Sequence, residues 1–317
     1  MTDKICVALL AGGRSGEREV SLKGATEVAK ALDPEKYRVL RYDPATDLGL
    51  LASTAHEIDV AFILLHGLLG EDGTMQGFLD QLGIPYQGSG VLGSAMAMDK
   101  NVAKIIYRHA GLPVPEWVMV SRGDSSSTGE MIECLGLPLV IKPLRQGSSL
   151  GISIATTEAE LIAGLAEAFC YDDRVMVEKF IKGREITVGV MGNDSLIALP
   201  LVEIIPSSDH VFFDYTAKYD PHAATSEVCP AEFPDEITSR AQEYGLIAHR
   251  ALMLRGYSRT DMIVNEHGIF ILETNTIPGM TPTSLLPQAA KVYGLSFSRL
   301  LDRLLELALD KGAGELP

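Results

Sequence analysis

Residues 259–286 read RTDMIVNEHGIFILETNTIPGMTPTSLL, and this stretch decides how the chain folds. Two apolar runs, Met262 to Val264 and Ile269 to Leu272, flank the tetrapeptide Asn265 to Gly268. Asn and Gly suit the backbone of a tight turn, so the pattern predicts a β-hairpin. The strands of a hairpin run antiparallel, which places the start of the first strand beside the end of the second.

The polar residues of this hairpin gather at its open end. The polar residues that interrupt the apolar pattern are Asp261 at one end, and Glu273 and Asn275 at the other. Because side chains alternate along a strand, Glu273 and Asn275 share one face. Two carboxylates and an amide oxygen suit Mg²⁺, whose remaining ligands are usually water and substrate phosphates. Ordinary surface acids at a solvated hairpin end are the alternative reading.

The chain leaves the hairpin through a Pro-Gly loop, Thr276 to Met280, and reaches Ser284. Serine is a favoured residue at the start of a helix. A helix that begins at Ser284 points its first backbone N–H groups outward, where they can bind an anion.

Length and charge narrow the class of protein. The 317 residues suffice for two or three domains, and a net charge of −15 argues against nucleic acid or an anionic membrane as the main partner. The four cysteines are scattered, with no CxxC pair, and no apolar run approaches the ~20 residues that span a membrane. We therefore expect a cytoplasmic enzyme.

The N-terminal segment predicts the opening of a βαβ unit. An apolar strand, Ile5 to Leu10, runs into the glycine-rich loop 11–17 and then into a helix that ends near Leu32. The loop is a poor dinucleotide fingerprint, because Ala11 stands where the first glycine belongs. Glu17 either stabilises the helix dipole or faces the ammonium group of a ligand.

A second strand, Ile58 to Leu65, also opens into a glycine-rich loop, which begins with His66. Loops at the carboxyl ends of parallel strands are where α/β sheets bind ligands. His66 is thus a candidate site residue, although a lone histidine in this position is more often structural.

The middle of the chain carries three lysines of interest. One helix is expected from Ser94 to His109, with Lys100 and Lys104 on it, and Lys142 ends an apolar strand. A lysine in that position either extends its tail into solvent or meets a phosphate. Gly147 to Gly151 matches G-x-S-x-G with Ser149 as nucleophile, but that motif needs a helix directly after it. Because a strand pattern follows instead, a phosphate-covering flap is the better interpretation.

Further along, Glu178 and Glu185 fall at the edges of predicted strands, where they are either surface acids or contacts for a nucleotide. One strand is expected from Ser195 to Ile205, and a long helix from Pro234 to Leu254. The aromatic segment 212–219 between them is not periodic, which is typical of a functional loop.

With these segments in place, the sequence resembles the D-alanine–D-alanine ligases of the ATP-grasp superfamily over essentially its whole length. The motifs that carry the resemblance agree in order and spacing: GGRSGEREVSL, HGLLGEDGTMQG, MDK, VIKP with RQGSSLG, VEKFIKGREITV, FFDYTAKYD, and SRTDMIV with LETNTIPGMTPTSL. Each one alone is weak evidence, but together they are specific.

The resemblance implies an α/β (α+β) fold of three domains: a Rossmann-like domain at 1–90, a central ATP-grasp domain at 91–183 and a C-terminal ATP-grasp domain at 184–317. It implies ATP and two Mg²⁺ ions, for which Mn²⁺ can substitute. It also implies which residues bind them, namely Lys100, Lys142 and Lys218 at the phosphates, Glu178, Lys179, Ile181 and Glu185 at adenine and ribose, Gly147 and Ser149 in the flap, and Asp261, Glu273 and Asn275 at the metals.

For the amino-acid substrates, the resemblance implies that Glu17 binds the ammonium of the first D-alanine and that His66 lies near its carboxylate. Ser148 and Tyr219 are expected to link with Glu17 and close the site. The remaining roles fall to Arg259 and the Gly279 N–H at the tetrahedral oxyanion, and to Ser284 and the Leu285 N–H at the second carboxylate.

The implied reaction uses ATP to turn one D-alanine into an acyl phosphate, which the amine of the second then attacks, for peptidoglycan synthesis. A homodimer and small-molecule partners alone are expected. Two positions depart from the family pattern: Gln146 replaces the usual Glu, and Leu68 replaces a small residue or proline. A ligase for D-serine or D-lactate, and a nucleotide-binding regulator without catalysis, are the competing hypotheses.

Overall fold

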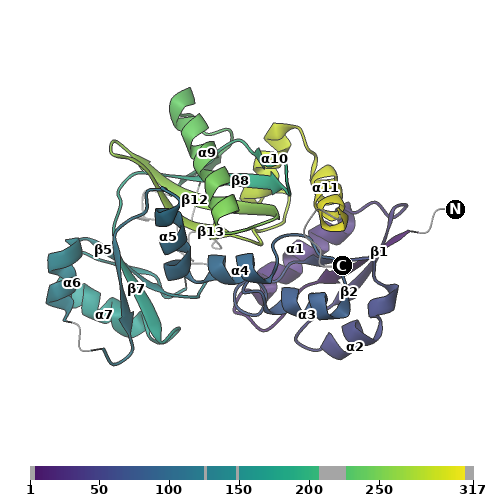
Figure 1. The fold of residues 1–317 in the computed structure, drawn as a ribbon, viewed down its shortest axis with the longest axis horizontal. Coiled ribbons are helices and arrows are strands. Elements are labelled where there is room, and N and C mark those ends of the chain that lie inside the picture. The colour runs from purple at the N-terminus through teal and green to yellow at the C-terminus, as the bar shows by residue number, and fades with distance from the viewer. Residues whose placement is uncertain (1–3, 125–126, 148–149, 207–225, 311–317) are drawn as a thin grey trace.

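The computed structural model describes residues 4–124, 127–147, 150–206 and 226–310. Four of the predicted site residues therefore lie outside the described residues, namely Ser148, Ser149, Lys218 and Tyr219. The chain forms three sheets that follow one another along the sequence (Figure 1). This mixed α/β architecture agrees with the fold class expected from the sequence.

The first sheet is parallel, with β1 in the middle of the order β2-β1-β3. Five of the six residues of β1 are buried, as its apolar sequence predicts. The elements of this region are β1 (Ile5–Leu10), α1 (Arg18–Ala31), β2 (Tyr37–Tyr42), α2 (Leu48–Ser53), η1 (Ala55–Glu57), β3 (Val60–Ile63) and α3 (Thr74–Leu82). The loops that follow β1 and β3 carry Glu17 and His66.

The second sheet is antiparallel, in the order β4-β7-β5-β6. Its strands and covering helices are β4 (Trp117–Ser121), α6 (Thr128–Leu135), β5 (Leu139–Pro143), β6 (Ser153–Ala155), α7 (Glu158–Ala168) and β7 (Arg174–Lys179). The expected strand after the glycine-rich loop is β6, so no helix follows Gly151 directly. This arrangement rules out the nucleophile-elbow reading of G-x-S-x-G.

The third sheet is also antiparallel, in the order β11-β10-β8-β12-β13, and β9 pairs with β8. Helix α9 lies across β8 and β12, and the last two helices lie toward the first sheet (Figure 1). These elements are β8 (Arg184–Gly192), β9 (Ile197–Ala198), β10 (Val202–Ile205), β11 (Ser226–Val228), α9 (Asp235–Ala251), β12 (Gly256–Asn265), β13 (Gly268–Asn275), α10 (Leu285–Tyr293) and α11 (Phe297–Leu309).

The predicted hairpin is β12 and β13, and its register brings the polar residues together. Asn265 pairs with Gly268 across a two-residue turn, and at the other end Asp261 pairs with Glu273. Arg259 pairs with Asn275 two positions closer to the open end. A β-bulge follows Asp261.

Two sequence expectations about single elements were wrong. The helix expected from Ser94 to His109 is two helices, α4 (Val91–Met98) and α5 (Lys100–His109), because Asp99 caps the second one by accepting hydrogen bonds from Asn101 N and Val102 N. The strand expected from Ser195 to Ile205 is split into β9 and β10. Pro200 lies in the gap, where it has no N–H to donate to a ladder.

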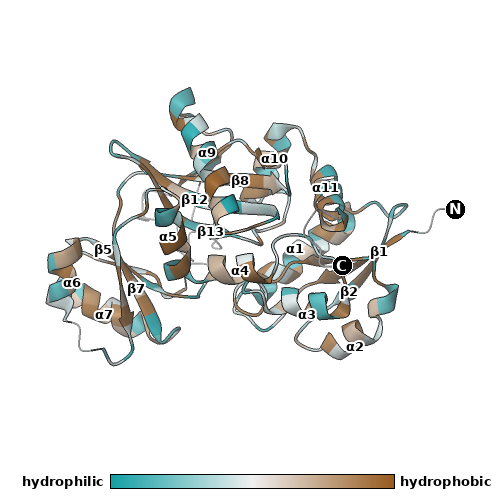
Figure 2. Cartoon of the chain, in the orientation of Figure 1, coloured by the Kyte–Doolittle hydropathy of each residue, from teal (hydrophilic) through white to brown (hydrophobic). Residues whose placement is uncertain are grey.

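The buried apolar residues join the sheets to one another. One core cluster combines β1, β3 and α1 with α10 and α11, and another combines α4 and α5 with β12, β13 and α9. Figure 2 shows the same pattern, with the strands mostly hydrophobic and the polar residues on the outer faces of the helices. Tyr107 in α5 also donates a 2.7 Å hydrogen bond to Thr274 Oγ1 in β13.

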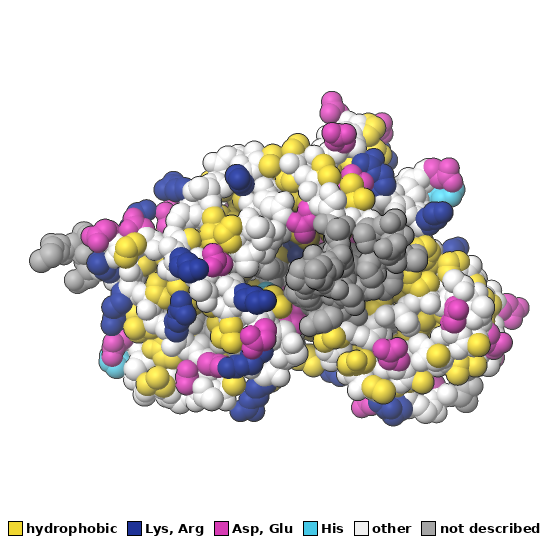
Figure 3. Space-filling view, turned by 180° about the vertical axis from the view of Figure 1, so that it is seen from behind, with side chains coloured by type: hydrophobic (Ala, Val, Ile, Leu, Met, Phe, Trp, Pro, Cys, Tyr) yellow, Lys and Arg dark blue, Asp and Glu magenta, His cyan; other side chains and the backbone are white. Residues whose placement is uncertain are grey.

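Among the described residues, no helix is long and apolar enough to cross a membrane. On the face seen in Figure 3, basic and acidic side chains are interspersed.

Candidate active site

A cleft of about 760 Å³ lies between the second and third sheets. Its walls are apolar, with contributions from Val140, Ile154, Phe180, Ile263 and Leu272. Seven of the residues singled out in the sequence also line it: Lys142, Glu178, Lys179, Ile181, Glu185, Asp261 and Glu273. Apolar walls with a few placed charges are typical of a cofactor site.

Lys142 and Glu178 form a buried ion pair on adjacent strands of the second sheet. Glu178 also binds a second lysine, because Lys104 Nζ lies 2.8 Å from its Oε2 atom. Burial works against the charge of Glu178, but the two lysines hold the pKa of its carboxyl below the usual value. Burial likewise opposes the charge of Lys142, while Glu178 and Glu273 raise its pKa.

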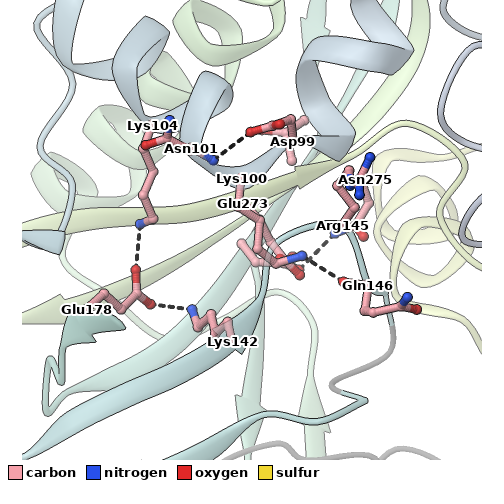
Figure 4. A network of polar contacts seen from close by, with 12 residues as sticks. Asp99, Lys100, Asn101, Lys104, Lys142, Arg145, Gln146, Glu178, Glu273 and Asn275 are labelled. Atoms are coloured by element: carbon pink, nitrogen blue, oxygen red, sulfur yellow. Dashed lines mark hydrogen bonds and ion pairs between the residues drawn. The ribbon is translucent and has the colours of Figure 1, made fainter. Parts of the chain in front are cut away.

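Lys100 connects the flap loop to the hairpin. Its Nζ donates a 2.7 Å hydrogen bond to the Gln146 carbonyl oxygen and lies 3.5 Å from Glu273 Oε2 (Figure 4). The Gln146 side chain instead donates to the Tyr171 carbonyl oxygen at 3.2 Å. A glutamate at position 146 has no N–H for that bond, which gives the departure from the family pattern a local structural reason.

The hairpin mouth holds a dense set of contacts around Asp261. Arg259 donates to both of its carboxylate oxygens at 2.8 Å, and Thr187 donates to Oδ1 at 2.6 Å. Asn275 Nδ2 donates to Oδ2 at 3.0 Å. Burial works against the charge of Arg259, but Asp261 raises the arginine pKa above its ordinary value, so the guanidinium stays protonated.

A second cavity, of about 1280 Å³, adjoins the cleft, since Glu273 lines both. Strands of the third sheet and loops that connect strands of the first and second sheets bound it. The predicted residues that line it are Glu17, His66, Gly147, Arg259, Glu273, Asn275, Gly279, Ser284 and Leu285. The fold thus brings the residues expected at the amino-acid substrates to the end of the nucleotide cleft.

Glu17 lies at the N-terminus of α1 and is 8% exposed. The flap loop passes close to it, because a Cβ atom added at Gly147 would lie 2.9 Å from Glu17 Oε2. Burial lowers the pKa of the neighbouring His66, an effect that the Glu17 carboxylate partly offsets. His66 is therefore mainly neutral near pH 7.

Glu71 belongs to this cavity although the sequence reasoning gave it no role. Its Oε2 accepts a 2.7 Å hydrogen bond from Gly67 N, and its Oε1 accepts one of 3.3 Å from Ile277 N. One carboxyl group thus joins the loop after β3 to the loop that carries Gly279. Burial and the Glu17 charge raise the pKa of Glu71 to about 8. The only sequence signal was its place in the HGLLGEDG loop.

Ser284 sits directly before α10, as expected, with Leu285 as the first residue of that helix. The Ser284 hydroxyl contacts Thr281 Oγ1 at 2.8 Å and accepts from Thr281 N at 3.1 Å. A Cβ atom added at Gly279 would lie 3.1 Å from Ser284 Oγ. The helix start and the Gly279 loop therefore form one packed wall of the cavity.

The departure at Leu68 lies away from these contacts. Leu68 is 37% exposed and, with Leu69, lines a third cavity of about 600 Å³, which shares His66 with the cavity described above.

A lysine-lined cleft between two antiparallel sheets, with acidic oxygens at its floor and a second cavity beyond them, defines an ATP-grasp enzyme. Two family models match the chain, the D-ala D-ala ligase N-terminus at residues 44–89 and the D-ala D-ala ligase C-terminus at residues 106–306. The chain belongs to the D-alanine–D-alanine ligase family.

Individual relatives agree with this assignment. The chain is 58% identical to the D-alanine–D-alanine ligase of Desulfotalea psychrophila, with 99% of this chain and 98% of that one covered. A D-alanine–D-alanine ligase from Bacillus anthracis solved with ATP superposes with a TM-score of 0.85 at 36% identity, covering 96% and 97% of the two chains. The VanG D-Ala:D-Ser ligase of Enterococcus faecalis superposes with a TM-score of 0.84 at 35% identity, covering 96% and 100%.

Proposed function

We propose that this protein joins two D-alanines into D-alanyl-D-alanine for peptidoglycan precursor synthesis, through a D-alanyl phosphate, with release of ADP and phosphate. One observation carries the proposal. Glu273 lines both the nucleotide cleft and the cavity beyond it, so a γ-phosphate held in the cleft meets a carboxylate held in the cavity. Phosphoryl transfer asks mainly for such positioning and for charge neutralisation.

In the cleft, the base of ATP would lie against the apolar walls and the β7 end, where Lys179, Ile181 and Glu185 line the space. Lys100 and Lys142 would neutralise the phosphates. Gly147 places the flap backbone near Glu17, in line with a flap that covers the phosphates and excludes water from the acyl phosphate. Ser148, Ser149, Lys218 and Tyr219 keep the roles that the family resemblance implies.

The residues at the hairpin mouth fit magnesium. Asp261, Glu273 and Asn275 offer hard oxygen atoms that the strand register brings together. Nowhere among the described residues, the hairpin mouth included, do three or more His, Cys, Asp or Glu side chains form a group that could hold a metal by themselves. An incomplete protein cage suits Mg²⁺, which takes further ligands from ATP phosphates and water. When bound, two Mg²⁺ ions, or Mn²⁺ in their place, would neutralise charge on the transferred phosphoryl group. The amide of Asn275 would turn from Asp261 to present its oxygen.

In the cavity, Glu17 would pair with the ammonium of the first D-alanine, and His66 would lie near its carboxylate. Arg259 and the Gly279 N–H would stabilise the oxyanion that forms when the second amine attacks. Ser284 and the Leu285 N–H would bind the second carboxylate at the positive end of α10. Each of these residues lines the same cavity, which supports the assignment.

We also propose the division into domains at 1–90, 91–183 and 184–317. Each of the three sheets falls within one of these ranges, which supports it. Helices α4 and α5 belong to the central range but pack on β13 and α9, so they would hold the second and third domains together. A homodimer, a cytoplasmic location, and partners limited to ATP and D-alanine complete the proposal.

The proposal is tested by ADP release from ATP and Mg²⁺ in the presence of D-alanine, with L-alanine as the control. We expect turnover that requires the D-enantiomer. Equal turnover with L-alanine would rule out the assignment.

The alternative function is ligation of D-alanine to D-serine or D-lactate. The structural similarity to the D-Ala:D-Ser ligase is the observation that favours it. Product masses from a mixture of D-alanine, D-serine and D-lactate decide between them. D-alanyl-D-alanine as the main product supports the proposal, and a mixed dipeptide or depsipeptide supports the alternative.

A further inference from the structure

Lys104 is a buried lysine that the proposed chemistry does not use. Its side chain is 1% exposed, on α5, one helical turn after Lys100. Residues four apart share a helix face, so both lysines point toward the second sheet. They differ in what they reach: Lys100 contacts the flap and Glu273, whereas Lys104 contacts Glu178 (Figure 4).

Glu178 is shared between two lysines. Its Oε2 lies 2.8 Å from Lys104 Nζ, and its Oε1 accepts a short hydrogen bond from Lys142 Nζ. All three groups are shielded from water, and the exposed fractions of their side chains are 1%, 2% and 11% for Lys104, Glu178 and Lys142. Coulomb interactions are strong in such a place, so the balance of charge matters more than at the surface.

The position of Lys104 explains how Lys142 retains its charge for a ligand. Burial lowers the pKa of Lys104, an effect that the Glu178 carboxylate opposes. With both lysines protonated the three groups carry one net positive charge, and of the three only Lys142 and Glu178 line the cleft. Without Lys104 the pair Lys142–Glu178 would be neutral, and Glu178 would have Lys142 as its only ion-pair partner here. Lys104 also lies 5.9 Å from the centre of the Trp117 ring, and Trp117 is opposite Glu178 in the β4–β7 register.

We propose that Lys104 is a positioning residue for nucleotide binding. It neutralises Glu178 from outside the cleft, so that the positive charge of Lys142 remains available to the ATP phosphates. This inference rests on the proposed function, because it assumes that the cleft binds ATP. It adds that the charge of Lys142 is set by a residue that does not line the cleft.

The first test is Lys104→Met, which keeps most of the aliphatic stem and removes the charge. We expect the Kd for Mg²⁺–ATP, measured by calorimetry without D-alanine, to rise roughly tenfold, the equivalent of about 1.4 kcal/mol. The KM for D-alanine should change less than twofold, because Lys104 lies outside the amino-acid cavity. If the Lys104→Met variant does not fold, Lys104→Gln, which removes the same charge, takes its place in every comparison.

The decisive measurement is a double-mutant cycle with Glu178→Gln. Once Glu178 is neutral there is nothing for Lys104 to balance, so Lys104→Met should raise the Kd for ATP less than twofold in that background. Lys104→Arg should stay within about threefold of the wild type. An equal effect of Lys104→Met in both backgrounds would overturn the inference, because it would mean that the lysine acts through packing alone.

Arg108→Met is the matched control. It removes a cation from the same helix and from the same tryptophan, whose ring centre lies 4.2 Å from the guanidinium carbon, but Arg108 has no contact with Glu178. Its Kd for ATP should equal that of the wild type. Trp117 is the only tryptophan, so its fluorescence reports whether each variant keeps the local fold. If wild-type protein fails to bind ATP, the proposed function fails; if it binds and the cycle is additive, only this inference fails.

Discussion

The nucleotide cleft and the amino-acid cavity differ in the charged side chains that line them. In the cleft, lysines and carboxylates are matched on rigid strands and on α5, as in the set Lys104, Glu178 and Lys142. In the cavity, the carboxyl groups of Glu17 and Glu71 lie on loops, near a neutral His66. Arg259 is already paired with Asp261.

The difference follows from what each space receives. A polyphosphate brings negative charge, so the cleft needs lysines whose charge is balanced only in part. The first amino acid brings an ammonium group, so a carboxylate such as that of Glu17 on the cavity wall has the charge to receive it. Glu273 stands at the junction, where it contacts Lys100 and faces both spaces.

Glu273→Gln removes the carboxylate at this junction and tests whether the two regions act as one site. We expect the largest effect here: loss of ADP release to background and weaker binding of Mg²⁺–ATP, because the glutamine lacks the negative charge that balances the metal. A coupled assay for ADP measures it, with Glu266→Gln in the exposed hairpin turn as the control. Turnover within tenfold of the wild type would contradict a shared metal site.

Arg259→Met tests the cavity side alone. Removal of one donor to a developing oxyanion lowers kcat by roughly 10²–10³. The Kd for ATP should change far less, because Arg259 lines the cavity and not the cleft. Steady-state kinetics and calorimetry together measure this split. A change confined to the Kd for ATP would place Arg259 on the nucleotide side instead.

Ser284→Ala addresses one wall of the cavity. It removes a hydroxyl group near the helix start, and the loss of one hydrogen bond to a charged carboxylate costs about 1.5–3 kcal/mol. We expect the KM for the second D-alanine to rise by roughly 10- to 100-fold, with the KM for ATP unchanged. Initial rates over a range of D-alanine concentrations resolve the two substrate sites. An unchanged second KM would show that the backbone alone binds this carboxylate.

Glu71 makes the loop-built cavity sensitive to pH. Its folded pKa of about 8 lies above the ordinary value of 4.5, so the folded state holds a proton that the unfolded chain loses. The free energy of unfolding should therefore fall as pH rises between these two values, by up to about 1.4 kcal/mol per pH unit.

Urea unfolding of the wild type and of Glu71→Gln at several pH values between 5.5 and 8.5 checks this smallest effect. In the glutamine variant the free energy of unfolding should fall less steeply with pH, because the glutamine side chain has no proton to release. Identical slopes in the two proteins would mean that Glu71 has an ordinary pKa.

Much of the fold followed from local pattern. The β12–β13 hairpin, the buried β1 strand and α3 are specified by nearby residues, through the two-residue period of strands and the turn residues between them. The break at Asp99 was equally local, and its capping signal was present in the sequence but was not used. The family motifs pointed to the site residues, and the described ones among them line the two adjoining spaces, except Lys100, which lines another pocket that also contains Glu273.

The sequence by itself determined the hairpin, most of the strands and the residue types expected of a magnesium-assisted phosphoryl-transfer site. Only the tertiary structure decided which of these groups are already paired. Lys104 meets Glu178 across 74 positions, and Glu71 meets Ile277 across 206. Such contacts leave no periodic trace, because they depend on how separate sheets pack together and on the strength of charge interactions away from water.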